Sequence, residues 1–311
     1  MADEPPTPKA GLWLERKKQR RAEARANPKV HLNSAFPHVG VAIYYATPPA
    51  TVAGRIERLA QLLTDARWPW LPWWASYTAV DKRNDRSSIR VGGKNGTAPL
   101  LDGMSSPTMR TLHMNRARGD GSFTTVLLSL LRAGNPGTAM STWITCRSAE
   151  LPPDKTFEDF IALTHDLVLA LGSRHATIGA WPTFSHARCD TWQTRMILDT
   201  PKGDINLGLP SDFSEQLSLL SEWGFLLGET YARHPRWGTY LHPGHVAAIG
   251  GLDRLRAEVA PARLDAVGDL LYVQLTESID TAMSPLATEK RLALEGLMAP
   301  ILLGAERPQP P

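Results

Sequence analysis

Cysteine is scarce in this chain of 311 residues, which contains only Cys146 and Cys189. A disulfide framework needs a larger set of cysteines, and a zinc site usually needs closely spaced Cys or His pairs. The two cysteines have no partner at such a spacing. We therefore expect two reduced thiols in a reducing compartment.

Long apolar runs are also missing. No run approaches the roughly 20 residues that a membrane-spanning helix requires. The first residues, Met1 to Lys9, are acidic and proline-rich, which is the wrong chemistry for a secretory signal. Both absences predict a cytoplasmic protein without a membrane partner.

Positive charge is concentrated in one segment. The whole chain has a formal net charge of +3, but residues 1–30 hold eight Lys/Arg and four acids, a net +4, so the remainder is near −1. A nucleic-acid-binding domain is expected to show a basic stripe on its folded face. We expect residues 1–36 to be a basic, largely flexible arm and nucleic acid not to be a partner, although a nucleic-acid-binding tail remains an alternative for the arm.

The body of the chain has an ordinary globular composition, 42% hydrophobic and 21% charged. A chain of about 300 residues buries roughly 75% of the surface that its unfolded form exposes. It therefore needs no disulfide or metal to stay folded. We expect one domain over residues 37–303 and a disordered tail over 304–311.

Hydrophobic periodicity predicts strands and helices in mixed order. Val39–Ala46 is an apolar strand that ends before two prolines, and the following apolar residues recur at helical spacing: Val52, Ile56, Leu59 and Leu63. Two strands at 123–131 and 140–147 flank a turn signal and predict a hairpin. A helix from about 156 to Gly172, a strand at 175–181 and a helix over 211–231 follow. Beyond them we expect a strand at 237–241, two short helices, a hairpin turning at 267–269 and a last helix from about 287. This order predicts an α+β fold, a two-layer sandwich of a mostly antiparallel sheet with helices packed on one side.

A cluster of tryptophans lies before a polar stretch. Four tryptophans fall within seven residues, and the two prolines among them predict a turn or irregular loop. Trp is enriched at binding hot spots, but rings of this size also close the open end of a sheet and its helices. Residues 81–106 are polar and Gly-rich and predict a long surface excursion with room for a short hairpin. The candidate partner-binding residues are Trp68, Trp70, Trp73, Trp74, Asp81 and Asp85.

Catalytic and metal-binding patterns are weak. Of nine histidines only His242 and His245 are close together, and zinc would need a third protein ligand. We expect two surface histidines at a helix start, no metal and no cofactor. The chain has no G-x-S-x-G nucleophile elbow, and Gly92–Gly96 lacks the spacing of a phosphate loop. We expect no enzyme, with a hydrolase that uses dispersed His, Asp and Cys residues as an alternative.

The C-terminal third carries a more specific pattern. Trp237 precedes Leu241 by four residues, a short helix ends in Gly250-Gly251, and a second short helix leads to an apolar hairpin at 264–275. This pattern resembles the type VI secretion immunity family associated with VRR-Nuc effectors, formerly a family of unknown function. The resemblance extends over about residues 37–303, is motif-like over 235–275, and is lost at 277–285.

The resemblance implies a protein that binds a cognate toxin and blocks it by occlusion, with a nuclease as one candidate target. The motif residues themselves suit a structural role: Trp237 and Leu241 pack on the core, and Gly250 and Gly251 allow positive φ. A nuclease has a basic substrate cleft, so an acidic face with aromatic residues would suit it. The identity of the toxin, the contact residues and the oligomeric state stay open.

Overall fold

The computed structural model describes residues 38–65, 73–79, 88–91, 97–106, 109–117, 123–129, 140–147, 154–181, 197–200, 203–206 and 231–302. The elements of the first half are β1 His38–Tyr45, η1 Pro49–Thr51, α3 Arg55–Leu63, β2 Trp73–Ala79, β3 Ser88–Val91, α4 Ala98–Met104, β4 Met109–Ala117, β5 Phe123–Ser129 and β6 Met140–Arg147. Those of the second half are α5 Asp154–Leu171, β7 His175–Trp181, β8 Ile197–Thr200, β9 Gly203–Asn206, β10 Gly238–Leu241, α8 Pro243–Ala248, α9 Leu252–Val259, β11 Arg263–Val267, β12 Leu270–Gln274, η5 Ile279–Thr281, α10 Pro285–Met298 and η6 Ala299–Ile301.

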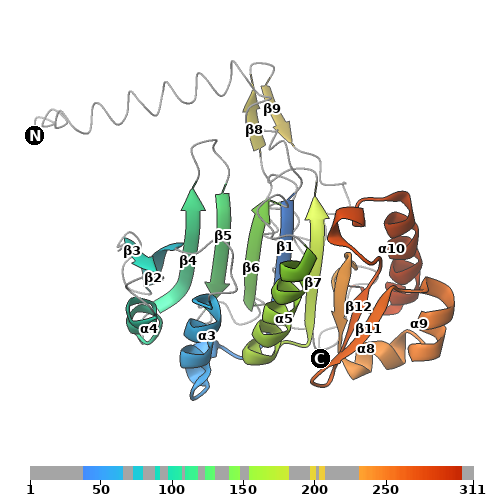
Figure 1. Ribbon diagram of the computed structural model, residues 1–311, viewed down its shortest axis with the longest axis horizontal. Helices are drawn as coiled ribbons and strands as arrows, with labels where there is room; N and C mark the ends of the chain where they lie inside the picture. The colour runs from blue at the N-terminus through green and yellow to red at the C-terminus, as the bar shows by residue number, and fades with distance from the viewer. Residues whose placement is uncertain are drawn as a thin grey trace, which may run out of the picture.

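One large sheet organises the fold. Its ten strands follow the order β11-β12-β10-β7-β1-β6-β5-β4-β2-β3, and β8 and β9 form a separate pair (Figure 1). Each named strand pair is antiparallel. Strand β1, the first strand of the sheet in the sequence, lies between β6 and β7. Strands that are far apart in the sequence are therefore neighbours in the sheet.

Strand β1 is central and buried on both faces. All eight of its residues are buried, which explains why its sequence is an unbroken apolar run rather than an alternating one. Val39, Val41 and Ile43 point into the main core. Tyr44 points to the opposite face, where its ring stacks on His175 at a centroid distance of 5.8 Å.

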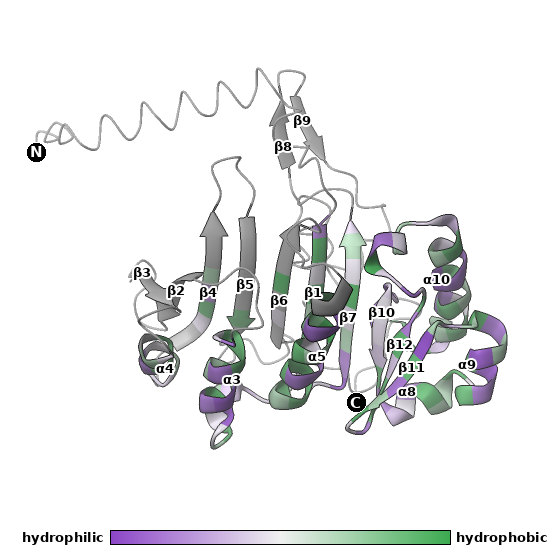
Figure 2. Ribbon diagram, viewed as in Figure 1, coloured by the Kyte–Doolittle hydropathy of each residue, from purple (hydrophilic) through white to green (hydrophobic). Residues whose placement is uncertain are grey.

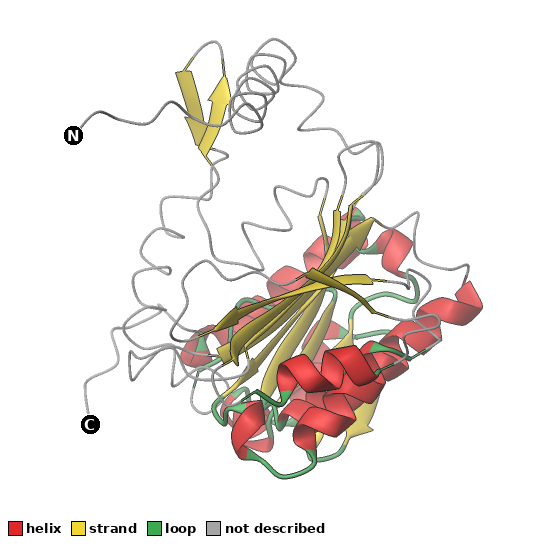
Figure 3. Ribbon diagram, turned by 90° about the vertical axis from the view of Figure 1, so that its left-hand side faces the viewer, coloured by secondary structure: helices red, strands yellow, loops and turns green. Residues whose placement is uncertain are grey.

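Helices α3 and α5 cover the core side of the sheet. Ile56, Leu59 and Leu63 of α3 are buried, as their helical spacing predicts. Apolar and hydrophilic residues alternate along α3 and α5 as an amphipathic pattern requires (Figure 2). Figure 3 shows the strands as a twisted layer with helices beside it. Gly172 ends α5 with φ +61°, a conformation that favours glycine.

Helix α8 covers the opposite face of the sheet near β7 and β10. His175 points toward His245 of α8. The next residue of β7, Ala176, is paired with Tyr240, and the Tyr240 ring contacts His165 of α5. Successive strand residues point to opposite faces, so α5 and α8 lie on opposite sides of the sheet.

The predicted α+β class and the mostly antiparallel sheet are confirmed. The two-layer arrangement with helices on one side describes the part of the sheet beneath α3 and α5. Around β7 and β10 the sheet has helices on both faces, because β7 carries buried side chains on each side. The strand at β7 and the hairpins β5–β6 and β11–β12 are also confirmed.

The prediction that residues 81–106 form a surface excursion is wrong in part. Strand β3 pairs with β2, which agrees with the hairpin that the prediction allowed, but α4 buries Leu100 and Met104. These two residues are four apart and share a helix face, but the surrounding Gly and polar residues conceal that pattern. The predicted helix over 211–231, the arm and the tail lie outside the described residues, except for Tyr231. The domain limits stay predictions.

Candidate functional site

The motif between Trp237 and Gly251 holds the C-terminal part of the sheet together. Trp237 and Leu241 are buried. Gly250 and Gly251 have φ values of +93° and +91°, which let the chain leave α8 and enter α9 directly. Trp237 and Leu241 therefore lie in the core, whereas Gly250 is exposed and Gly251 is half-buried in the turn.

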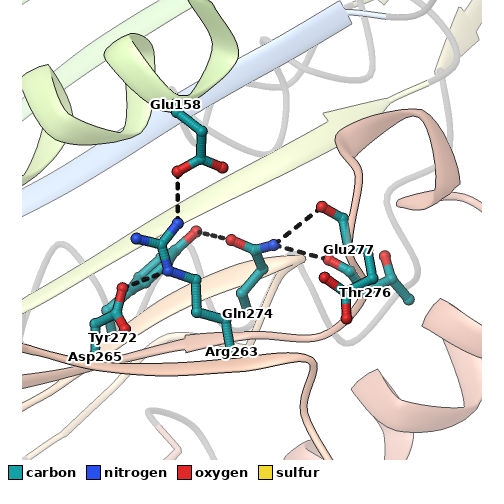
Figure 4. Close-up of polar contacts among 7 residues, drawn as sticks. All are labelled: Glu158, Arg263, Asp265, Tyr272, Gln274, Thr276 and Glu277. Atoms are coloured by element: carbon teal, nitrogen blue, oxygen red, sulfur yellow. Dashed lines mark hydrogen bonds and ion pairs between the residues drawn. The ribbon is translucent and has the colours of Figure 1, made fainter. Parts of the chain in front are cut away.

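A buried polar network fixes the segment that follows β12. The Trp237 indole Nε1 donates a hydrogen bond of 2.8 Å to Thr276 Oγ1. The Thr281 hydroxyl lies 2.8 Å from the same oxygen. The Gln274 amide donates to the carbonyl oxygens of Thr276 and Glu277 (Figure 4). The chain from β12 to η5 is therefore held against Trp237.

An ion-pair cluster links the edge strand β11 to α5. The Arg263 guanidinium donates to Glu158 at 2.7 Å and also to Asp265, two residues further along the strand (Figure 4). Glu158 belongs to α5, so the contact joins residues 105 positions apart. This cluster is partly exposed and sets one guanidinium against two carboxylates at the sheet edge.

A pocket opens where the end of β7 meets the start of α10. We call it the α10 pocket; its cavity volume is about 230 Å³. Its main lining residues are Ala180, Trp181, Arg236, Trp237, Met283 and Arg291. The network around Thr276 positions two sides of this pocket, because it fixes Trp237 and the chain leading to Met283.

Basic groups surround a single carboxylate beside the α10 pocket. One Glu295 oxygen lies 2.8 Å from His234 Nδ1, and the other accepts from Arg291 at 2.6 Å. The hydrogen bond from His234, together with the positive charges of Arg291 and Arg236, holds the pKa of Glu295 below its usual value against the opposing effect of burial. Glu295 is therefore ionised at neutral pH.

Two buried histidines lie on the other side of β7 from α5. His175 Nε2 accepts a hydrogen bond of 3.0 Å from the Arg233 backbone N–H, so the ring proton is on Nδ1, which donates to the Tyr240 carbonyl at 2.9 Å. His245 is 2% exposed, and neither ring nitrogen has a hydrogen-bond partner among the described residues. The prediction of two surface histidines is therefore wrong for His245, because α8 turns its ring inward against β7. His242 stays at the helix start and caps it by accepting from the Gly244 N–H.

The predicted partner-binding residues lie away from the α10 pocket or outside the described residues. Trp73 and Trp74 open β2, paired with Val91 and Arg90 of the edge strand β3. Trp68, Trp70, Asp81 and Asp85 fall outside the described residues. Their role stays a prediction.

The α10 pocket has no single sequence signal. Its lining comes from the end of β7, the segment just before β10 and the first half of α10. The local sequence feature nearest to this pocket is the helix cap of α10, where the Ser284 side chain accepts a hydrogen bond from the Ala287 N–H.

Among the residues that the structure describes, no group of three or more His, Cys, Asp or Glu side chains is arranged to hold a metal ion. None of the described helices has the length and apolar character needed to cross a membrane.

The structure thus defines an α+β protein with a ten-stranded antiparallel sheet and a pocket lined in part by two tryptophans and two arginines. No family model matches the chain, and no curated protein matches it. A solved structure, the T6SS protein PA0821 of Pseudomonas aeruginosa, is similar with a TM-score of 0.53 over 86% of this chain and 73% of that chain, at 14% sequence identity. At that identity the likeness concerns the fold. The neighbour is a type VI secretion protein, while membership of the immunity family stays a prediction.

Proposed function

We propose that this protein is a type VI secretion immunity protein that binds a cognate antibacterial effector and neutralises it. The observation that carries the proposal is the fold shared with the T6SS protein PA0821 over most of the chain. The resemblance of residues 235–275 to the immunity family supports the same conclusion from the sequence. The proposed place of action is the cytoplasm.

The proposed mode of action is occlusion rather than catalysis. An inhibitor of this kind needs a rigid surface that complements its target, and it needs no reactive group. Burial of Trp237 and Leu241 and the polar network around Thr276 supply rigidity at the C-terminal end of the sheet. A nuclease effector is one candidate target.

Co-expression with the effector tests the proposal. The effector to use is the product of a neighbouring gene that codes for a large secreted protein with a C-terminal toxin domain. Cells that make its toxin domain should survive when this protein is also made and should die when it is absent. The purified pair should also elute as one complex in size-exclusion chromatography.

Protection should be selective for that effector. An unrelated toxin, expressed at a matched level, serves as the control and should kill whether or not this protein is present. Death of the cells in the presence of the protein, together with separate elution of the two proteins, would refute the immunity proposal.

A further inference from the structure

We infer that the outer edge of β11 receives an extended segment of the effector, which adds a strand to the sheet and carries a basic and an apolar residue separated by one position. This inference rests on the proposed function and deepens it, because it assigns the geometry and the chemistry of one contact. We call this surface the β11 edge; it consists of the outward side of Arg263–Val267 and the neighbouring side chains of α5. It is a different surface from the tryptophan cluster at residues 68–74.

The backbone of β11 offers hydrogen-bonding groups on its outer side. Strand β11 is the last strand of the ten-stranded sheet, and its partner among the described strands is β12. A two-residue turn that begins with Gly268, at φ +62°, closes this hairpin, so Val267 and Leu270 form a hydrogen-bonded pair. Hydrogen-bonded and non-hydrogen-bonded pairs alternate along an antiparallel ladder. Leu264 and Ala266 therefore direct their N–H and C=O groups away from β12, where an added strand can bond to them.

The β11 edge carries a surplus of negative charge. Arg263 pairs with both Glu158 and Asp265 (Figure 4). The ionised groups that act on the neighbouring Tyr272 are the same three, one cation and two anions. Arg263 engages one oxygen of each carboxylate, and the other oxygen of each has no hydrogen-bond partner among the described residues. A Lys or Arg of an added strand, placed beside Asp265, therefore forms a favourable cross-strand pair.

An apolar side chain lies at the turn end of the same edge. Leu169 of α5 is 48% exposed, and a Cβ placed on Gly268 would lie 2.7 Å from its Cδ2 atom, so Leu169 lies over the β11–β12 turn. Asp265 is opposite Tyr272, whose ring contacts α5, so Asp265 and Val267 both lie on the α5 face of the sheet. An added strand with a basic residue beside Asp265 presents its next residue but one beside Val267. An apolar side chain there covers the exposed surface of Leu169.

A second copy of the chain fits the β11 edge less well than the effector does. Two copies would bring together two clusters with the same negative surplus, and like charges on neighbouring strands are destabilising. The charge of the edge therefore selects a basic segment of a different protein. An effector with a basic substrate cleft is one source of such a segment.

Binding of the cognate effector to the full-length protein tests the backbone and the charge separately. Ala266→Pro removes an outward N–H that β12 does not use and should weaken binding about tenfold in titration calorimetry. The double variant Asp265→Asn, Glu158→Gln keeps the whole backbone and removes both acids. It should weaken binding about tenfold at low salt and less at high salt. Because this variant changes only partly exposed side chains, it tests the edge even if Ala266→Pro lowers the thermal stability.

Each variant has a matched control. Ala266→Val changes the same side chain but keeps the N–H. The double variant Asp253→Asn, Glu258→Gln removes the acids of two exposed ion pairs on α9. Both controls should bind the effector as the wild type does. Equal binding by the wild type and by both edge variants would overturn the inference while leaving the proposed function intact, whereas no binding by the wild type would count against the proposed function.

Amide hydrogen exchange is a second measurement and needs no substitution. The amides of Leu264 and Ala266 should exchange quickly in the free protein and slowly in the complex with the effector, because the added strand bonds to them. The amides of α9 should exchange alike in both states. Fast exchange at Leu264 and Ala266 in the complex would overturn the inference. A dimer of the free protein in analytical ultracentrifugation that Ala266→Pro dissociates would also overturn it, because the β11 edge would then pair with a second copy.

Discussion

His175 of β7 and His245 of α8 lie against each other inside the protein, with ring centroids 6.1 Å apart and ring planes at 83°. Burial, followed by the nearby His245 and then by Arg233, lowers the pKa of His175 to about 3 despite its hydrogen bond to the Tyr240 carbonyl. Burial, followed by the nearby His242, lowers the pKa of His245 to about 4. Both rings are therefore neutral when the protein is folded at neutral pH.

Mild acid should destabilise the fold through these two rings. Below the ordinary histidine pKa of 6.5 these two histidines bind protons in the unfolded chain but not in the folded chain. The free energy of unfolding therefore falls as the pH falls. The loss is about 1.4 kcal/mol per pH unit for each histidine, or about 4 kcal/mol for the two between neutral pH and about pH 5. Urea unfolding at the two pH values measures it.

His245→Leu is the control for this pH dependence. It removes one of the two titrating groups together with both of its unpaired ring nitrogens. The variant should show about half of the wild-type change with pH. Equal stability of the wild type at the two pH values would contradict the assignment of two neutral, buried histidines.

Gly251→Ala should destabilise the protein because of its backbone conformation alone. Gly251 has φ +91° and ψ 176°, and a Cβ there would have no atom within 4 Å. This backbone region is essentially restricted to glycine, so the free energy of unfolding should fall by about 1–3 kcal/mol. Gly296→Ala on α10, where a Cβ also meets nothing, should instead stabilise the helix by about 0.5–1 kcal/mol. The same sign for both variants in urea unfolding would refute the backbone argument.

The Trp237–Thr276 hydrogen bond should appear as a coupling energy. Trp237→Phe removes the Nε1 donor, and Thr276→Val removes the Oγ1 acceptor; both residues are buried. Each single variant should lose stability, partly because one buried polar atom loses its partner. A double-mutant cycle on the free energies of unfolding should give a coupling of about 1 kcal/mol. Purely additive losses would mean that the bond contributes nothing.

The ion pair between Arg263 and Glu158 should contribute little. Glu158 is 56% exposed and Arg263 is 34% exposed, so solvent and salt screen the pair. Glu158→Gln should lower the free energy of unfolding by less than about 1 kcal/mol, and high salt should reduce the difference further. Glu258→Gln, at a similarly exposed pair within α9, is the matched control. A loss of several kcal/mol for Glu158→Gln that persists in high salt would show that the pair locks the sheet edge.

Local sequence patterns predict much of the secondary structure. The apolar run of β1, the helical spacing in α3 and the glycine that ends α5 each depend on residues only a few positions apart. The same holds for Gly250 and Gly251, whose positive φ follows from the need to join two short helices directly. Helix α4 escapes prediction because Leu100 and Met104 are buried by tertiary packing in a segment of polar composition.

The contacts of the candidate site do not follow from local sequence patterns. Trp237 is recognisable from the sequence as a core residue, but its contact with Thr276 across 39 positions is not. The sequence also leaves open which face of α8 points inward, so it does not predict that His245 is buried.

The sequence by itself determined the α+β class, the main hairpins and the glycine turns, since these follow from periodicity and from backbone preferences over short distances. Only the tertiary structure decided the order of the ten strands, the meeting of His175 with His245 and the position of Arg236 and Arg291 around one pocket. The reason is physical: any arrangement that removes apolar surface from water lowers the free energy. Local patterns therefore do not specify which distant segments meet. The order of the strands in the sheet decides which segments are neighbours, and the α10 pocket lies between such segments.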